Sequence, residues 1–407
     1  MGRARDLKSW SLIFCYVLFE VITHSKGVMD AITETLPSLN SSGSLNFTFL
    51  NFTCAESVLL TSVLGFRRYA NLIVVPLLVT VGLVGNVLII VVVSGNHVPF
   101  GFPSTKLFVR VLALADIFYL LGSPFFQTLR TLHYDTTWIP KSQLFPLIYP
   151  FVWPYMASVQ TLETWLMVAI TADRYVAVSR PFKSVFLCTA KRAAIQVGAI
   201  SVASAAFNIP HWLEFKTKLE FNACTGRLQN EVMDTALFRN STYLISYWSV
   251  MTLLFRFALP LGILCVLTSK LISTVRAAAI TRSELVVQSG TSSAEGQITR
   301  VLLSVVVLFL LCESTEFVMH ILLTLRWVWP AYAKFEDIGV QASFNTVGNV
   351  ALVLSASANF IMYLVFMKKF RVQCIAIVRC GKQKNYADGT TVSVVQMASS
   401  ATSTSEI

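Results

Sequence analysis

Seven long apolar stretches divide this chain and constrain its fold more than any other feature. They lie at roughly residues 70–95, 106–130, 144–172, 193–213, 243–269, 299–325 and 338–366. Each is long enough to cross a hydrocarbon core of about 30 Å at roughly 1.5 Å per residue of helix. The chain is 55% hydrophobic and only 13% charged, whereas soluble domains carry about 25% charged residues. The sequence therefore predicts an all-α membrane protein, a seven-transmembrane helix bundle over residues 70–366.

The net charge of +11 is spread over the loops instead of forming one patch, which argues against a nucleic-acid partner. Basic residues are dense after the third and seventh stretches and around the loop after the fifth: Arg180, Lys183, Lys191, Arg192, Lys270, Arg276, Arg282, Arg300, Lys368, Lys369, Arg371, Arg379, Lys382 and Lys384. The loops on the other side of the membrane hold fewer basic residues. The positive-inside rule then predicts a multi-pass plasma-membrane protein with an extracellular N-terminus and a cytoplasmic C-terminus.

The region before the first stretch has two parts. Residues 1–25 have a basic start and an apolar middle, which favours a signal peptide over a plain extracellular tail. Residues 26–69 are predicted to form a glycosylated extracellular tail. Four glycosylation sequons all fall on the predicted outer side, at Asn40, Asn46, Asn51 and Asn240.

Two segments outside the seven stretches have a predictable structure. Residues 216–221 alternate like a short strand, so we expect a β-hairpin that lids the bundle. Residues 367–380 form an amphipathic pattern typical of a short eighth helix lying on membrane lipids. Cys374 and Cys380 in that segment are candidates for palmitoylation.

The C-terminal residues 381–407 are rich in Ser and Thr and are expected to be disordered. Phosphorylation there would add negative charge for an arrestin to bind. The last three residues, Ser405-Glu406-Ile407, fit the ends that PDZ domains bind by strand addition.

Short motifs inside the stretches point to a receptor family. Asp173-Arg174-Tyr175 closes the third stretch, and Gly85-Asn86-Val87 lies in the first. Leu112-Ala113-Leu114-Ala115-Asp116 lies in the second, and Asn359-Phe360-Ile361-Met362-Tyr363 in the seventh. With Pro260 in the fifth stretch, the chain resembles rhodopsin-like (class A) G-protein-coupled receptors. The resemblance covers roughly residues 70–380 and implies a heterotrimeric G protein as partner.

Two further runs narrow the resemblance. Residues 149–154 open the third stretch with Tyr-Pro-Phe-Val-Trp-Pro, and residues 207–214 close the fourth with Phe-Asn-Ile-Pro-His-Trp-Leu-Glu. Both are similar to invertebrate FMRFamide-type neuropeptide receptors. The implied function is a receptor for an RFamide-like neuropeptide that activates a G protein when the peptide binds.

Several positions depart from the family pattern. Cys312-Glu313-Ser314-Thr315 stands where many receptors have Cys-Trp-x-Pro, so the aromatic switch and the proline kink are both missing. An amine receptor would need an aspartate at Met156, and an opsin a lysine at Val353. A receptor for an unrelated peptide and a constitutively active or weakly signalling receptor remain open. A channel or transporter is the alternative from a different class, although no internal repeat is found. No catalytic motif or metal-binding cysteine pattern is present, so neither an enzyme nor an organic cofactor is expected.

Ionisable residues inside a bilayer are costly, so each is a candidate for function. The resemblance implies that Asp116 holds a sodium ion, and Glu163 sits where the same pocket usually offers a serine. Two carboxylates there would bind Na⁺ or share a proton. A hydrogen-bond network without an ion is the structural alternative.

The resemblance also assigns residues to G-protein coupling and activation: Asp173, Arg174, Tyr175, Glu295, Asn359 and Tyr363. In the inactive state Arg174 is expected to pair with Asp173 and with Glu295. On activation it would be released to face the Gα C-terminal helix.

The implied ligands end in Arg-Phe-amide, and a buried arginine needs a carboxylate for specific recognition. Glu316 is the first candidate, because Glu316 and His320 are four residues apart and share one helix face. Glu214 at the mouth is a weaker candidate. Tyr155 and Trp248 are candidate aromatic contacts. Arg256 is either part of this site or an internal partner that neutralises Glu316 or Glu313.

Receptors of this family tie their second outer loop to the third helix by a disulfide, but here that helix offers Tyr149 and no thiol. Cys224 lies in the loop, and Cys54 is the other cysteine of the mature extracellular region. Two cysteines in an oxidising compartment favour a Cys54–Cys224 bridge. Two free thiols or a bridge between chains are the alternatives.

Overall fold

The computed structural model describes residues 60–95, 102–134, 143–222, 227–284, 294–328 and 338–383. Within these ranges, side chains are described except at residues 60–64, 222, 227, 278–284, 294–295, 326–328, 338–342 and 378–383. Asn40, Asn46, Asn51, Cys54, Cys224 and residues 384–407 lie outside the described ranges. The predictions made for them therefore remain predictions.

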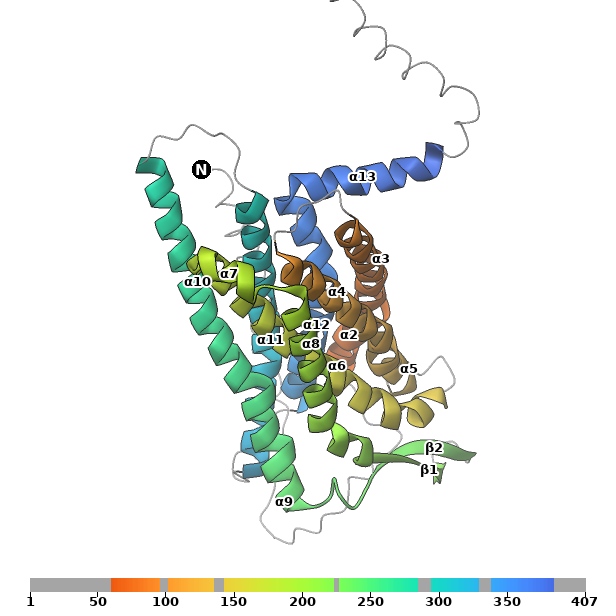
Figure 1. Cartoon of the computed structure of the whole chain (residues 1–407). Helices are drawn as coiled ribbons and strands as arrows, with labels where there is room; N and C mark the ends of the chain where they lie inside the picture. Colours follow the sequence, from red (N-terminus) through yellow and green to blue (C-terminus); the bar gives the residue numbers. More distant parts are fainter. Residues whose placement is uncertain are drawn as a thin grey trace, which may run out of the picture.

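The described chain forms an up-and-down bundle of long helices (Figure 1). Several helices contain π-helical segments, labelled η, and η3 is a 3₁₀ turn. The elements are α2 (Leu60–Tyr69), η1 (Ala70–Val74), α3 (Val75–Ser94), α4 (Pro103–Ser123), η2 (Pro124–Thr128), α5 (Leu129–Tyr134), α6 (Leu144–Ser179), α7 (Pro181–Leu187), α8 (Ala190–Phe207), η3 (Ile209–Leu213), β1 (Phe215–Asn222), β2 (Arg227–Asp234), α9 (Ser241–Tyr243), η4 (Leu244–Met251), η5 (Leu253–Ala258), α10 (Leu259–Glu284), α11 (Ala294–Val328), α12 (Ile338–Phe366) and α13 (Lys368–Gln383).

Six of the helical rods in the described ranges are both long and apolar enough to cross a membrane. The seventh rod, α6, has 36 residues and is long enough, but its buried Gln160, Glu163 and Thr164 make it less apolar. A helix in the middle of a bundle can carry such polar side chains because its neighbours shield them from lipid. The seven-helix membrane bundle predicted from the sequence is therefore present.

The predicted β-hairpin is also present, and it lies at one end of the bundle (Figure 1). Strands β1 and β2 pair antiparallel from Phe215 opposite Asp234 to Asn222 opposite Arg227. Two hydrogen bonds fix the hairpin to the start of α6: Thr217 Oγ1 donates to the Pro146 carbonyl at 2.6 Å, and the Asn230 amide donates to Gln143 Oε1 at 2.7 Å. We call this end of the bundle the hairpin end, and the opposite end the α13 end.

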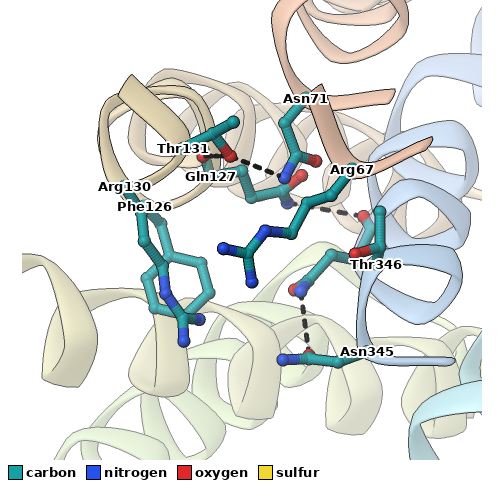
Figure 2. Close-up of a pocket in the computed structure, with 9 residues that line it drawn as sticks. Arg67, Asn71, Phe126, Gln127, Arg130, Thr131, Asn345 and Thr346 are labelled. Atoms are coloured by element: carbon teal, nitrogen blue, oxygen red, sulfur yellow. Dashed lines mark hydrogen bonds between the residues drawn. The ribbon is translucent and has the colours of Figure 1, made fainter. Parts of the chain in front are cut away.

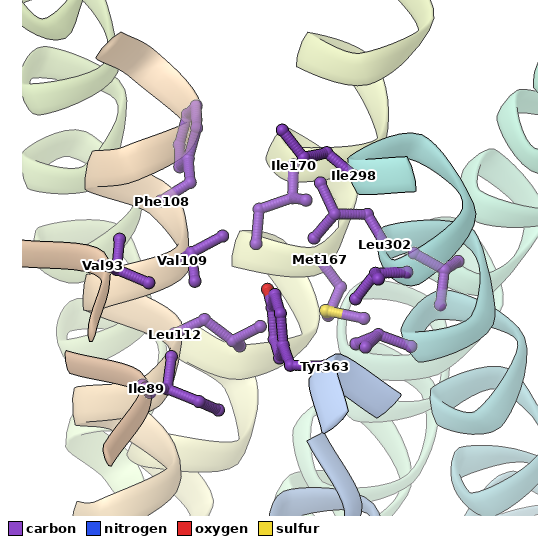
Figure 3. Close-up of a cluster of buried hydrophobic side chains, with 14 of the residues drawn as sticks. Ile89, Val93, Phe108, Val109, Leu112, Met167, Ile170, Ile298, Leu302 and Tyr363 are labelled. Atoms are coloured by element: carbon purple, nitrogen blue, oxygen red, sulfur yellow. The ribbon is translucent and has the colours of Figure 1, made fainter. Parts of the chain in front are cut away.

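The larger hydrophobic core lies toward the α13 end, between α3, α4, α6, α11 and α12. Figure 3 shows Leu112, Met167 and Leu302 from three of these helices around the ring of Tyr363. The amphipathic helix α13 adds Phe370 and Cys374 to the same cluster, because its apolar face turns toward the bundle. This packing positions the last turn of α12 and, toward the hairpin end, the polar residues in the middle of the bundle.

The helices extend further than the apolar stretches predicted. The first rod begins at Leu60, inside the segment expected to be extracellular tail, and α6 continues past residue 172 to Ser179. The terminal helix runs to Gln383, beyond the expected end at residue 380. Hydropathy detects the part of a helix that lies in lipid, whereas polar residues can continue the same helix into water.

Candidate functional site

Arg174 is buried at the α13 end and pairs with the residue before it. Its Nη2 atom lies 3.4 Å from Asp173 Oδ2, and the arginine is only 2% exposed. Thr105 on α4 donates a hydrogen bond to the same carboxylate oxygen at 3.3 Å. The expected Asp173–Arg174 pair is thus present, and α4 holds it in place. The second expected partner, Glu295, is a residue of α11 whose side chain is not described.

A buried polar cavity lies in the middle of the bundle. Asp116 from α4, Glu163 from α6 and Asn359 from α12 all line it. Asn359 Nδ2 donates a 2.6 Å hydrogen bond to Asp116 Oδ2, whereas Glu163 Oε1 has no hydrogen-bond partner. The structure therefore brings together the two carboxylates that the sequence placed in one pocket.

Glu313 from α11 is a third carboxylate in the same cavity. It is fully buried, and neither of its oxygens has a hydrogen-bond partner. From the sequence, Glu313 was a possible partner of Arg256 and not a member of the Asp116–Glu163 pocket. Its spacing within α11 could not show that it faces α4 and α6. In the described part of the chain, no group of His, Cys, Asp and Glu has an arrangement suited to a metal ion.

Arg256 does not form the internal ion pair considered from the sequence. Its guanidinium donates to Gln160 Oε1 on α6 and lies 5.1 Å from the centre of the Phe257 ring. Among the described residues, no ion pair joins Arg256 to Glu313 or Glu316. The reason is local geometry: Arg256 lies in the π-helical segment η5, whose i→i+5 bonding rotates side chains away from positions expected for an α-helix.

Glu316 and His320 do not point into one common site. His320 Nε2 lies 3.1 Å from the Trp248 carbonyl and 3.3 Å from the Ser249 carbonyl, so it faces η4. Glu316 faces α12 instead, where a Cβ added at Gly348 would lie 2.4 Å from its Oε1. That oxygen has no hydrogen-bond partner. Glu316 Oε1 is thus a buried acceptor without a partner, whereas His320 Nε2 lies against the η4 backbone.

Glu214, predicted as a weaker ligand contact, has its carboxylate engaged by other side chains of the protein. Glu214 is fully buried at the start of the hairpin. Its oxygens accept from Trp153 Nε1 at 2.6 Å and from the Tyr243 hydroxyl at 2.7 Å, and His211 Nδ1 lies 2.7 Å away. The residue ties α6, η3 and α9 together at the hairpin end.

The two candidate aromatic contacts also have structural partners. The Tyr155 hydroxyl donates a 2.6 Å hydrogen bond to the Phe118 carbonyl, and its ring lies against Gly122 of α4. It therefore does not face the mouth of the bundle. Trp248 is half-buried, and its ring centre lies 5.3 Å from that of His320. The roles of Tyr155 and Trp248 as ligand contacts stay predictions.

Comparison with known proteins decides the family. The profile described as "7 transmembrane receptor (rhodopsin family)" matches residues 85–363, more than half of the chain. This chain belongs to the rhodopsin family of seven-transmembrane receptors. An FMRFamide receptor of Drosophila melanogaster is 26% identical over 228 residues, which cover 56% of this chain and 39% of that receptor. The chain thus spans about two fifths of the length of that relative.

Two other relatives are matched over more of their length. The FMRFamide peptide receptor frpr-18 of Caenorhabditis elegans is 23% identical over 307 residues, covering 75% of this chain and 68% of that receptor. Galanin receptor type 1 of Mus musculus is 24% identical over 321 residues, covering 78% and 84% respectively. All three relatives are named as receptors, two of them for FMRFamide and one for galanin.

The rhodopsin-family motif on α12 has Phe360 where its proline is expected, and the structure shows how this ring is accommodated. A Cβ added at Gly85 on α3 would lie 2.6 Å from Phe360 Cβ. The absence of a side chain at Gly85 therefore leaves the space that the phenylalanine fills. Nearby, Asn86 Nδ2 donates to the Ala356 carbonyl at 2.9 Å, which joins α3 and α12 at this level.

The third transmembrane helix, α6, lacks the cysteine that family members use to attach the second outer loop, and other contacts attach the hairpin here. The Tyr149 ring lies 5.2 Å from the Phe215 ring of β1 in a T-shaped arrangement. Together with the Glu214 bonds and the two hairpin bonds, this aromatic contact attaches the hairpin to α6 without a covalent link between them. The sequence alone does not reveal this contact, because Phe215 lies 66 residues away along the chain.

Three modification candidates lie in the described helices or directly before one. Asn240 is exposed, and its Oδ1 accepts from the Thr242 amide at 2.9 Å as the cap of α9. Its Nδ2, the atom that a glycan would modify, is not used by that bond. Cys374 is buried and lies in the core cluster, whereas Cys380 is in α13 with its side chain outside the described set.

Proposed function

We propose that this rhodopsin-family receptor binds an RFamide-like neuropeptide outside the cell and activates a heterotrimeric G protein inside. Two relatives named for FMRFamide support the ligand class. The observation in the structure that carries the proposal is Glu316. It is a half-buried carboxylate with an oxygen that has no protein partner. A ligand guanidinium would supply a charge-assisted hydrogen bond to that oxygen.

The proposed orientation places the hairpin end outside and the α13 end in the cytoplasm. The basic residues of α13, Lys368, Lys369 and Arg371, support this orientation. Arg174 then lies on the side where a G protein would bind. The peptide would act by population shift: it binds more tightly to the conformation in which Arg174 has left Asp173, and so raises the population of that conformation.

The test compares two peptides on one variant. FMRFamide and its citrulline analogue, which lacks the positive charge, are assayed for G-protein activation on the wild-type receptor and on Glu316→Gln. Loss of one charge-assisted bond should weaken FMRFamide by about 1.5–3 kcal/mol, while the citrulline peptide should be affected much less. Glu220→Gln, in the exposed part of the hairpin, is the control for a general loss of charge.

Equal losses for the two peptides at normal surface expression would show that Glu316 does not meet the ligand arginine. Galanin belongs in the same assay, because a receptor for it is 24% identical over 78% of this chain. Activation by galanin alone would favour the second candidate, a receptor for an unrelated peptide. High nucleotide exchange without any peptide would favour constitutive signalling.

The mid-bundle cavity carries a second proposal. Asp116, Glu163 and Glu313 place three carboxylates around one cavity, and a bound Na⁺ or a shared proton would offset their repulsion. Replacing sodium by a large organic cation should change agonist affinity of the wild-type receptor if Na⁺ binds there, and should not change it in Asp116→Asn. An arrestin, a PDZ domain and membrane lipids are further proposed partners, and they rest on the sequence of the C-terminal region.

A further inference from the structure

Arg256 is buried in the middle of the bundle and is held by a neutral partner. Its guanidinium donates to Gln160 Oε1 on α6 and lies 5.1 Å from the centre of the Phe257 ring. Its Nε atom is buried and has no hydrogen-bond acceptor in the described structure. A guanidinium that has lost its hydration is stabilised most by a carboxylate. This conformation therefore leaves part of the donor capacity of Arg256 unused.

Glu313 on α11 is the matching acceptor. Its side chain is fully buried, and neither carboxylate oxygen accepts a hydrogen bond in the part of the chain that the structure describes. A carboxylate without a partner at this depth is costly. A conformation in which Arg256 reaches Glu313 would satisfy both residues.

The two residues belong to surfaces that already pack together. The Phe257 ring, next to Arg256, has its centre 6.2 Å from that of Phe317 and 5.3 Å from that of His320, both on α11. Glu313 precedes these two residues by four and seven positions, so all three share one face of α11. Arg256 is also close enough to attract Glu313 electrostatically. The helices that would form the pair are therefore neighbours in this structure.

The segment that carries Arg256 has a means of turning it. Arg256 lies in η5, which follows the π-helical segment η4 after the single residue Thr252. Such segments are rare and occur frequently at functional sites. When a π-helical turn returns to α-helix, its bonds change from i→i+5 to i→i+4, and the side chains around it change direction. A change of this kind in η5 would turn Arg256 away from Gln160.

The first, second and seventh rods have a different kind of polar contact. Figure 2 shows the bond from Asn71 Nδ2 to Thr131 Oγ1, which is 2.9 Å long, and Gln127 Nε2 donates to the Asn349 carbonyl at 3.4 Å. No carboxylate is among the described residues that line this group, so its amides have no charged acceptor to turn to. The choice between a neutral and a charged partner thus concerns the third, fifth and sixth rods.

We propose that Arg256 exchanges partners during activation. It bonds to Gln160 in the closed conformation, in which Arg174 is paired with Asp173, and it pairs with Glu313 in the open conformation, in which Arg174 has left Asp173. Gln160 and Arg174 are 14 residues apart on α6, which is about four helical turns, so they lie on one face. The bond to Gln160 holds the fifth rod to the helix that carries Arg174. The pair with Glu313 would hold it to α11 instead.

The exchange gives the proposed peptide a route into the bundle. A ligand guanidinium at Glu316 would cancel the charge of that carboxylate and repel Arg256. Glu313 lies three residues earlier on α11, toward the α13 end, and would then be the nearest acidic partner for Arg256 on that helix. This coupling rests on the proposed peptide-receptor function, whereas the two partners of Arg256 do not depend on it.

The first experiment needs neither a peptide nor a G protein. Thermal stability of the purified full-length receptor is measured for Gln160→Met, Glu313→Gln and the double variant. The sodium concentration is kept fixed, because Glu313 also lines the mid-bundle cavity. Alone, Glu313→Gln should leave the Tm unchanged or raise it, since the carboxylate has no partner to lose. In the Gln160→Met background Arg256 has moved to Glu313, so the same substitution should lower the Tm by about 2–4 °C.

Gln196→Met on the exposed side of α8 is the matched control. In this background Glu313→Gln should act as it does in the wild-type receptor. An equal loss of Tm with and without Gln160→Met would show that the pair already exists in the closed conformation. No loss in the Gln160→Met background would show that Arg256 does not move to Glu313. If Gln160→Met does not fold, Gln160→Asn serves instead, because its shorter side chain withdraws the oxygen from Arg256, and the same reversal is expected.

The second experiment tests the link to activation. Gln160→Met removes a bond from the closed conformation only, so nucleotide exchange without peptide should rise by up to about tenfold. Adding Glu313→Gln should return the exchange to the wild-type level. Asp173→Asn, which weakens the contact with Arg174 directly, is the positive control.

The outcomes separate this proposal from the proposed function. A rise in Asp173→Asn but not in Gln160→Met would overturn the link to activation, and so would a rise in Gln160→Met that persists in the double variant. If neither Asp173→Asn nor Gln160→Met raises the exchange, the proposed G-protein coupling fails. The Tm comparison then decides by itself whether Arg256 exchanges partners.

Discussion

The indole of Trp153 on α6 donates a 2.6 Å hydrogen bond to the carboxylate of Glu214, which lies just before strand β1. The bond connects the helix at the centre of the bundle to the hairpin at its end. Both residues belong to runs that resemble FMRFamide-type receptors. In the structure, the bond between them attaches the hairpin to α6. A buried carboxylate with three polar partners from the protein is held firmly in place.

Replacing Glu214 should therefore lower stability and not ligand affinity. In Glu214→Ala, one buried and two half-buried polar groups lose their partner, and we expect the free energy of unfolding to fall by about 3 kcal/mol. The check is thermal unfolding in detergent together with surface expression. Glu220→Ala, in the same hairpin but with a side chain 41% exposed, should change stability little. Normal expression of Glu214→Ala with selectively weakened peptide binding would contradict the structural role.

Gly348→Ala should displace the Glu316 carboxylate without unfolding the receptor. The new Cβ would lie 2.4 Å from Glu316 Oε1, the far end of a side chain that can turn away. We expect near-normal expression and about a tenfold loss of FMRFamide potency, the effect of weakening one charge-assisted bond. Gly262→Ala is the matched control, because no atom lies within 4 Å of its added Cβ. Unchanged potency in Gly348→Ala would place the ligand arginine elsewhere.

Asp173→Asn should raise nucleotide exchange in the absence of peptide. The substitution removes the charge that holds Arg174, whose Nη2 is 3.4 Å from Asp173 Oδ2. A charge-assisted bond of this length contributes about 1.5 kcal/mol, so the active population should rise by up to about tenfold. Guanine-nucleotide exchange on membranes from cells expressing equal receptor amounts measures it. Arg180→Gln changes an exposed charge in the neighbouring loop and should leave basal exchange unchanged.

Palmitoylation should modify Cys380 and not Cys374. Cys374 is only 7% exposed and packs with Phe370, and burial raises the pKa of its thiol. The reactive thiolate is therefore scarce at Cys374 near neutral pH. Hydroxylamine-sensitive acyl exchange should lose its signal in Cys380→Ser and keep it in Cys374→Ser. The opposite pattern would mean that α13 leaves the bundle in cells.

The sequence by itself determined the class and the order of elements. Long apolar stretches must be helices in lipid, because every backbone group there needs an internal partner. The hairpin and α13 were also predicted from the sequence. The strand was recognised by alternating residues, and α13 by its amphipathic pattern. The motif around Arg174 and its pairing with the adjacent Asp173 also followed from local sequence.

Only the tertiary structure decided which ionisable side chains are satisfied. From the sequence, Glu214 and Glu316 were both candidate ligand contacts. In the structure, Glu214 has three hydrogen-bonding partners, whereas Glu316 Oε1 has none. Arg256, in the π-helical segment η5, bonds to Gln160 of α6 and not to Glu313 or Glu316 in the described structure. The partners of a buried side chain come from other helices. Their relative rotation depends on packing and on π-helical turns that the sequence spacing does not reveal.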